Sequence, residues 1–274
     1  YYKNIINKHY KNIKFTKKEK NLEIIRDKKP IFIIGLPRSG STLIESILTS
    51  SDEKIKSCAE SHVINMSILE QIGPKIYTND FNPNKFIFEI NQAEIEKSIL
   101  KNYGQFNIFN KSISPIFIDK SLENFFNIEI ILKVFPNAKF LHTFRNPVDS
   151  VISIYQSMLS ELSWTHKVKD ILEYINNYQI VIDYFKFKYS NKIMDINLEN
   201  FTNNSENIAE KIYRFCDLKW NKKYLEFYKR KNLFSKTMSF NQIRKEISKY
   251  DSTKYKPYIS LLEREQKFYK WLKI

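Results

Sequence analysis

Short apolar runs separated by longer amphipathic stretches mark the middle of this chain. The run Ile31–Ile34 contains no polar residue, as expected of a strand that is buried on both faces of a parallel sheet. Two further strands are predicted at 116–118 and 138–144, each followed by polar residues, and a fourth at 192–196. Strands of this kind that alternate with helices predict an α/β fold, a P-loop-like three-layer arrangement with a central parallel sheet flanked by helices.

The stretches between these strands carry apolar residues at the three- and four-residue spacing of helices. Pro136 ends one such stretch, and Pro147 fits the first turn of another, where Asp149 favours the helix dipole. Residues 1–29 are polar with scattered apolar positions and are predicted to form a helical extension, followed by one domain at 30–274. Helices are predicted at 42–50, 124–134, 147–159, 169–189, 206–216, 222–231 and 261–272.

The composition is that of a globular, basic protein. The 274 residues are 42% hydrophobic, and 45 Lys+Arg against 30 Asp+Glu give a formal net charge of +15. This charge suits an anionic ligand, but the lysines are spread along the chain without a basic, aromatic-interleaved run, so no nucleic-acid partner is expected. No apolar stretch reaches the ~18–20 residues of a membrane span. Cys58 and Cys216 are far apart and form no CxxC pair, which favours free thiols and a cytoplasmic location.

A phosphate-binding loop is predicted directly after the first strand, where the chain reads GLPRSGSTLIESIL. Gly35 and Gly40 have the spacing of a P-loop, whose backbone N–H groups point at an anion at the helix N-terminus. Ser41 stands where such loops have a lysine, and Arg38 supplies a charge inside the loop instead. Because that lysine contacts the β- and γ-phosphates, its absence disfavours triphosphate hydrolysis. A P-loop kinase or triphosphatase is the alternative enzyme, and a basic nucleic-acid-binding module the non-enzymatic alternative.

A second anion site is predicted at FRNPVDSVIS, which follows the strand at 138–144. Arg145 comes at the end of that strand, and Ser153 lies two turns along the predicted helix. If the N-terminus of this helix faces the crevice at the sheet edge, both side chains can address one phosphate.

These motifs together resemble the sulfotransferase family that uses 3′-phosphoadenosine 5′-phosphosulfate (PAPS), most closely tyrosylprotein sulfotransferases and bacterial sulfotransferases joined to tetratricopeptide repeats. GLPRSGSTLIESIL is similar to the family's 5′-phosphosulfate loop, and FRNPVDSVIS to its 3′-phosphate motif. FIDKSLEN is similar to its Asp-Lys-x-x-Glu-Asn segment, and CAES to its small-small-Glu segment. The resemblance implies transfer of a sulfuryl group from PAPS to an acceptor hydroxyl of a protein tyrosine, a carbohydrate or a small molecule. It is also compatible with a tetratricopeptide-repeat region upstream of Tyr1.

The resemblance assigns the donor to two sets of residues. The first would hold the 5′-phosphosulfate, with Arg38 near the transferring group, and the second would hold the 3′-phosphate. A closing loop near the C-terminus would add one residue to each set. The residues are Arg38, Ser39, Gly40, Ser41, Thr42 and Ser239 for the phosphosulfate, and Arg145, Ser153 and Arg244 for the 3′-phosphate.

The resemblance also implies the catalytic residues. Lys120 would lie beside the bridging oxygen, and Glu60 would take the proton of the acceptor hydroxyl, with Arg38 stabilising charge at the leaving oxygen. His62 is the rival base, because imidazole titrates near neutrality. In-line sulfuryl transfer relies mainly on positioning and charge stabilisation, so no metal is required. His142, inside a predicted strand, is interpreted as a core histidine.

Three departures from the family pattern bear on these roles. Ser121 and Leu122 replace the usual Met-Pro after the lysine, and Cys58-Ala59 replaces the usual glycine pair before the glutamate. The Gly-Arg-Trp-like element near the C-terminus is present only as Lys254-Tyr255.

Overall fold

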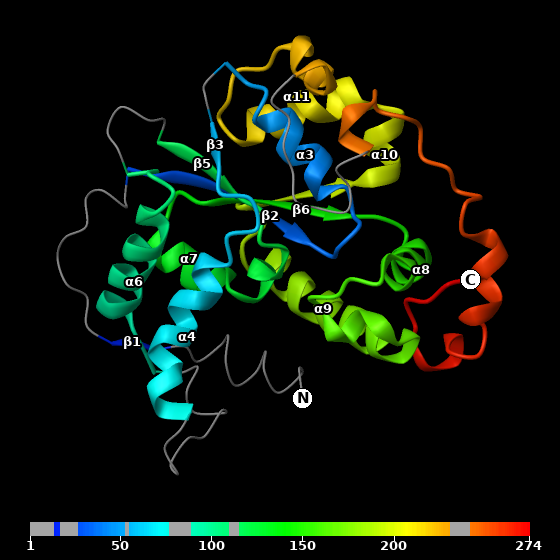
Figure 1. Cartoon of the computed structure of the whole chain (residues 1–274), viewed down its shortest axis with the longest axis horizontal. Helices are drawn as coiled ribbons and strands as arrows, with labels where there is room; N and C mark the ends of the chain where they lie inside the picture. The colour runs from blue at the N-terminus through cyan, green and yellow to red at the C-terminus, as the bar shows by residue number, and fades with distance from the viewer. Residues whose placement is uncertain (1–13, 17–26, 53–54, 77–88, 110–114, 231–241) are drawn as a thin grey trace.

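Five parallel strands form one sheet at the centre of the chain, with helices above and below it (Figure 1). The computed structural model describes residues 14–16, 27–52, 55–76, 89–109, 115–230 and 242–274. The strands of this sheet are β2 Lys29–Gly35, β3 Lys56–Ser57, β5 Ile116–Asp119, β6 Lys139–Phe144 and β7 Ile193–Asn197. Their order is β3-β5-β2-β6-β7, so β2 is the central strand. The predicted α/β fold with a parallel sheet is confirmed.

Helices cover both faces of the sheet because β2 is apolar on both. Phe32 and Ile34 pack into one core cluster, whereas Ile31 and Ile33 pack into another on the opposite face. The first cluster is covered by α4 Val63–Ile76, α6 Gln92–Gly104, α7 Ile128–Val134, α8 Pro147–Ser157 and α9 Val168–Lys188, and the second by α3 Ser41–Leu48, α10 Leu198–Asn203 and α11 Ser205–Phe215 (Figure 1).

The helix predicted at 124–134 is divided in two. A 3-10 helix, η2 Leu122–Phe126, precedes α7, and Asn127 between them has a non-helical backbone (φ −107°, ψ 8°). The Asn127 side chain donates to Asn65 Oδ1 at 2.6 Å, which is the kind of competing side-chain bond that interrupts helices. The helix predicted at 222–231 is also a 3-10 helix, η4 Lys222–Lys229.

The C-terminal helix predicted at 261–272 is wrong. The structure has only two short 3-10 helices there, η6 Lys256–Leu261 and η7 Gln266–Phe268. Leu262 and Leu272 are nevertheless buried in the core cluster that also contains α8 and α9. The apolar spacing therefore reflects anchor points of a segment that lies across the surface, and not one face of a helix.

The predicted N-terminal helical extension is wrong at three residues. Lys14–Thr16 form a strand, β1, that pairs in parallel with β4, Glu89–Asn91. Phe15 and Thr16 are of the aromatic and β-branched types that favour strands over helices. Residues 1–13 and 17–26 lie outside the described residues. The boundary between 29 and 30 falls inside β2, so Lys29 belongs to the sheet.

Candidate active site

The three motifs predicted to carry chemistry meet at the carboxyl edge of the sheet. Phe32 of β2 pairs with Asp119 at the end of β5, and Gly35 at the end of β2 pairs with Thr143 of β6. The segments that follow these strands are the loop 36–40, the 120–126 region and the start of α8. Ligands of open α/β sheets bind at this edge.

Two glycines allow the chain to turn from β2 into α3. Gly35 has φ 141°, and a Cβ there would lie 2.2 Å from the Thr143 carbonyl oxygen. Gly40 has φ 89°, and a Cβ there would lie 2.6 Å from Leu198 Cδ1. Between them Arg38 also has a positive φ, 66°. The loop therefore has the left-handed turns with which successive backbone N–H groups form an anion-binding concavity.

The serines and threonine of the loop differ in what they can offer a ligand. The Ser39 hydroxyl donates to Leu36 O at 2.7 Å and lies 2.8 Å from Thr143 Oγ1, so it holds the loop against β6. Ser41 and Thr42 begin α3, where the first N–H groups of a helix have no acceptor within the helix. Ser41 and Thr42 therefore stand at the end of the helix where backbone N–H groups face a ligand, which keeps their predicted role a prediction, whereas the Ser39 side chain has a structural role.

Replacing Gly40 with alanine is expected to lower the unfolding free energy by about 1–2 kcal/mol, the cost of a left-handed conformation for a residue with a Cβ. The added Cβ also meets Leu198, whose side chain is flexible and can move. Thermal melting of Gly40→Ala, Leu198→Ala and the double variant measures the two contributions. Alanine at 198 should relieve the contact but not the backbone strain, so a double variant restored fully to the stability of Leu198→Ala would contradict this explanation.

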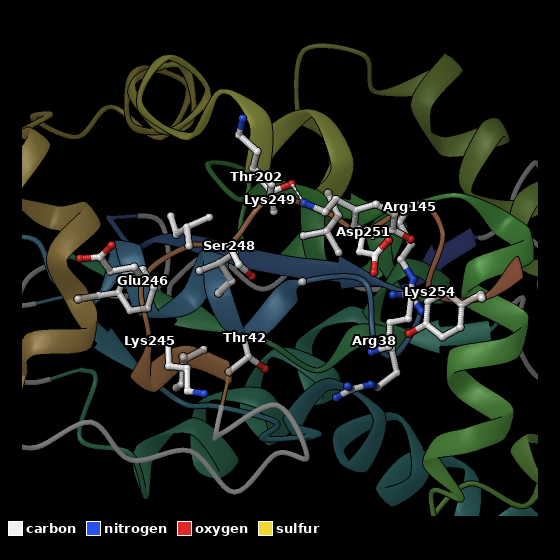
Figure 2. Close-up of a pocket in the computed structure, with 18 residues that line it drawn as sticks. Arg38, Thr42, Arg145, Thr202, Lys245, Glu246, Ser248, Lys249, Asp251 and Lys254 are labelled. Atoms are coloured by element: carbon white, nitrogen blue, oxygen red, sulfur yellow. Dashed lines mark hydrogen bonds between the residues drawn. The ribbon is translucent and has the colours of Figure 1, made fainter.

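A cavity of about 590 Å³, here called the basic pocket, opens beside the loop (Figure 2). Figure 2 shows Arg38, Arg145 and Lys254 together at one side of it. Burial, followed by the nearby charge of Arg145, holds the pKa of the Arg38 guanidinium below its usual range. Two like charges that disfavour each other are stabilised by an anion bound between them. The described residues that line the pocket include Arg38, Thr42, Arg145, Lys245, Lys249, Tyr250, Lys254 and Tyr255.

Arg145 is fixed by the helix that follows it and by the C-terminal segment. Its Nη2 donates to Asp149 O at 2.7 Å, and its guanidinium carbon lies 5.2 Å from the centre of the Tyr255 ring. The Tyr250 hydroxyl donates to the Asp149 carboxylate. Within the described part of the chain, Arg145 Nε is buried without an acceptor. A buried guanidinium with an unsatisfied N–H fits an anion such as phosphate.

Ser153, the other residue predicted at the second anion site, is buried beneath Tyr255. Burial tends to raise the pKa of the Tyr255 hydroxyl, but the hydrogen bond of Ser153 and the charge of Arg145 outweigh it and lower that pKa. Arg145 and Ser153 therefore both reach the hydroxyl oxygen of Tyr255 in this structure. Their joint contact with a phosphate stays a prediction.

Lys120 lies at the centre of a second polar cluster. It is 1% exposed, and its Nζ lies 2.6 Å from Glu60 Oε1 and 3.8 Å from Glu45 Oε2. The Ser57 hydroxyl donates to Glu45 at 2.5 Å. Burial raises the pKa of the Glu45 carboxyl, although the charge of Lys120 opposes the change. Lys120 is thus held between two carboxylates, and Glu45, one turn after Ser41 on α3, links it to the phosphate loop.

The aspartate that precedes Lys120, Asp119, is held by several hydrogen bonds. It is fully buried and accepts from the Ser121 backbone N–H at 2.8 Å and from the Tyr103 hydroxyl at 2.5 Å. The Ser61 hydroxyl and Asn124 also donate to it. Asp119 therefore fixes the turn after β5 and has a structural role.

His62 lies in the loop of Glu60 and is half-exposed. Its Nδ1 lies 2.5 Å from Glu123 Oε1 in η2, and its backbone N–H donates to the Ser121 hydroxyl at 2.8 Å. The hydrogen bond with Glu123 raises the pKa of the His62 imidazole, although partial burial opposes it. Ser121, a departure from the family pattern, thus helps to place the rival base.

Among the described residues, one predicted site residue, Arg244, does not line the site. Ser239 lies outside the described residues. Arg244, at the end of η5 Gln242–Arg244, is exposed and lines neither of the two cavities beside the loop. His142 is buried between Asp195 and Tyr178, as predicted for a core histidine. The sequence assigned no role to Glu45, Glu123, Tyr250 or Lys245. Glu45 and Glu123 stand inside two of the quoted motifs, but only the fold shows what their carboxylates contact, whereas Tyr250 and Lys245 lie outside every motif.

The described part of the chain holds neither a candidate metal cluster nor a candidate membrane span. No group of three or more histidine, cysteine, aspartate or glutamate side chains there could hold a metal ion. No helix there is both long enough and apolar enough to cross a bilayer. The expectation that no metal is required stays a prediction.

Comparisons with known proteins agree with this geometry. A profile described as the sulfotransferase family matches residues 30–222. An uncharacterized protein of Aquifex aeolicus (strain VF5) is 28% identical over 239 residues, which are 84% of this chain and 31% of that protein. The chain thus spans about a third of the length of this relative.

Two solved structures are similar in fold. The sulfotransferase domain of the Synechococcus PCC 7002 olefin synthase has a TM-score of 0.60 and 17% identity, with 88% of this chain and 91% of that domain covered. The sulfotransferase domain from the curacin biosynthetic pathway has a TM-score of 0.50 and 16% identity, with 84% and 87% covered.

Proposed function

This chain belongs to the sulfotransferase family, and we propose on that premise that it transfers a sulfuryl group from PAPS to an acceptor hydroxyl. The observation that carries the proposal is a pair of arginines, the half-buried Arg38 and the buried Arg145, which line one pocket beside a phosphate loop without a lysine. Such a pocket offers cationic partners to two separate phosphate groups, which is what distinguishes a 3′-phosphorylated donor from an ordinary nucleotide.

We assign the donor to the basic pocket. The N–H groups at the start of α3 and the Arg38 guanidinium would hold the phosphosulfate, and Arg145 with Ser153 would hold the 3′-phosphate. The lysines at 245, 249 and 254 raise the positive potential of the same pocket. Arg244 and Ser239 stay predictions from the resemblance.

Lys120 and Glu60 would act at the reacting end. The ammonium of Lys120 would stabilise charge that develops on the leaving oxygen, and the Glu60 carboxylate would accept the proton of the acceptor hydroxyl. In the structure these two groups are paired at 2.6 Å. The two side chains must therefore move apart for each group to reach its own target. When they do, Lys120 keeps a second carboxylate partner, because its Nζ lies 3.8 Å from Glu45 Oε2.

The pH profile of a Glu123→Gln variant separates Glu60 from His62 as the base. The carboxylate of Glu123 holds the pKa of His62 above its ordinary value, so its removal lowers that pKa. If His62 were the base, activity would require its neutral form, and the rising limb of kcat against pH would move to lower pH. With Glu60 as the base, that limb is expected to stay in place, and its displacement would transfer the role to His62.

Transfer of labelled sulfur tests the proposed activity. The purified chain is incubated with sulfur-labelled PAPS and with γ-phosphate-labelled ATP, in parallel, in fractionated extract of its host cell. Label from PAPS should enter a stable product that the Lys120→Met variant fails to form. Label from ATP in a product, with none from PAPS, would instead support the nucleotide-kinase alternative.

Three further predictions stay proposals on the same basis. They are the division of the chain into an N-terminal region and one domain, with the boundary of 29/30 moved to a point before β2, a cytoplasmic location, and a tetratricopeptide-repeat region upstream of Tyr1.

A further inference from the structure

A second cavity, here called the acidic pocket, adjoins the basic pocket at Arg38 and Thr42. Its volume is about 680 Å³, within the roughly 300–1,000 Å³ of small-molecule sites. Glu60 lines it, so an acceptor bound there would have its hydroxyl between the proposed base and the phosphosulfate loop. If the proposed function holds, this pocket takes the acceptor.

The two pockets differ in charge although they share Arg38. The described lining of the basic pocket has five basic and two acidic side chains, Arg38, Arg145, Lys245, Lys249 and Lys254 against Glu246 and Asp251. The described lining of the acidic pocket has three carboxylates, Glu60, Glu123 and Glu161, against Arg38 and the imidazole of His62. In a chain with a net charge of +15, this reversal is local to the pocket. An anionic acceptor would be repelled there and a cationic one attracted.

One of the three carboxylates stands apart from the catalytic cluster. Glu60 is paired with Lys120 at 2.6 Å, and Glu123 with His62 at 2.5 Å. Glu161 lies in the loop between α8 and the 3-10 helix η3, Ser163–His166, and forms no ion pair within the described residues. Its carboxylate is therefore available to a ligand.

A stacked pair of aromatic rings lines the same pocket. The rings of Trp164 in η3 and Tyr174 in α9 are stacked, with centroids 3.8 Å apart and an angle of 5° between the planes. Phe125 and Phe126 also pack edge-on against Tyr174, so the position of the stacked pair is supported by further aromatic contacts. Aromatic faces of this kind bind planar apolar groups, and they also attract cations.

We propose that the acceptor is a compact hydroxyaryl amine, a flat apolar ring that carries the reacting hydroxyl at one end and a cationic group at the other. The ring would lie against Trp164 and Tyr174, with the hydroxyl at Glu60 and the ammonium at Glu161. This inference rests on the proposed function. The inference goes beyond the proposed function because it excludes acidic acceptors, including tyrosines in acidic peptides.

Binding to the protein saturated with adenosine 3′,5′-bisphosphate tests the proposal without requiring turnover. Three phenols of matched size are titrated by calorimetry: tyramine (cationic), 4-ethylphenol (neutral) and 3-(4-hydroxyphenyl)propionate (anionic). Tyramine should bind most tightly and the propionate most weakly. The Glu161→Gln variant should weaken tyramine about two- to fivefold, as expected for a partly exposed ion pair, and leave 4-ethylphenol unchanged. Glu173→Gln, which removes an exposed carboxylate of α9 outside the pocket, is the matched control.

Each outcome is decisive. Equal or tighter binding of the propionate, no binding of any of the three phenols, or an equal effect of Glu161→Gln and Glu173→Gln would overturn the proposed acceptor class while leaving the donor site intact. Binding of adenosine 3′,5′-bisphosphate is measured before any phenol is added. If the bisphosphate does not bind, the proposed function is overturned, and with it this inference.

Discussion

The Arg145→Ala variant is expected to bind adenosine 3′,5′-bisphosphate about 100-fold more weakly than the wild type, whereas its affinity for 5′-AMP should be almost unchanged. Removing one partner of a buried, hydrogen-bonded charge pair costs about 2–5 kcal/mol, and a factor of 100 corresponds to about 2.7 kcal/mol. The two ligands differ only in the 3′-phosphate, which we assign to Arg145 and Ser153. The loss should therefore appear only with the ligand that carries this group.

Calorimetric titration of both nucleotides against both proteins measures the difference. Arg214→Ala, which removes an exposed arginine of α11, is a matched control for the change in net charge. Because Arg145 also stacks on Tyr255, thermal melting of the unliganded variant checks that the fold is retained. Equal weakening of 5′-AMP and of the bisphosphate would place Arg145 elsewhere than at the 3′-phosphate.

The second large effect concerns turnover. Lys120→Met and Glu60→Gln are each expected to lower kcat by about 100- to 1,000-fold, the usual cost of removing one group that stabilises charge in a transition state. Both variants should keep the affinity for adenosine 3′,5′-bisphosphate within about threefold, because neither residue lines the basic pocket. Single-turnover transfer from labelled PAPS measures kcat, and calorimetry measures the affinity.

These two variants also test whether the residues act as a unit. They are paired in the structure at 2.6 Å, so the double variant should lose much less than the product of the two single losses. A full multiplicative loss would mean that Lys120 and Glu60 act independently. Full activity of Glu60→Gln together with an inactive His62→Gln variant would reassign the base.

The strands and the phosphate loop were predictable because their signals are local. An uninterrupted apolar run such as 31–34 has few alternatives to a doubly buried strand, and Gly35 and Gly40 fit backbone conformations that only glycine adopts easily. Pro147 fixed the start of α8 for a similar reason, since it stands at the first helical position. Element types at such positions follow from the residues themselves.

The parts that could not be predicted depend on distant contacts. Asn127 interrupts a helix because its side chain bonds to Asn65, 62 residues earlier in the chain. Leu262 and Leu272 stand in an apolar pattern with helical spacing, yet they anchor a segment of turns and short 3-10 helices to the core. Lys245 and Lys249 line the basic pocket because the stretch at 243–251 lies beside Arg38 and Thr42, which are far from it in the sequence.

The candidate site shows the same limit. Glu45 and Glu123 lie within quoted motifs, yet only the fold shows that their carboxylates contact Lys120 and His62. Ser39 shows the reverse case, because its position in the loop suggested a ligand contact and its hydroxyl instead bonds to Leu36 and Thr143.

Thermal melting with two nucleotides tests the central claim, a donor site built for 3′-phosphorylated adenosine, most directly. Adenosine 3′,5′-bisphosphate at 100 times its Kd should raise the unfolding free energy by about 2.7 kcal/mol, and ATP at the same concentration should have a much smaller effect. An equal response to both nucleotides, or no response to the bisphosphate, would contradict the assignment of Arg38 and Arg145 to the two ends of PAPS.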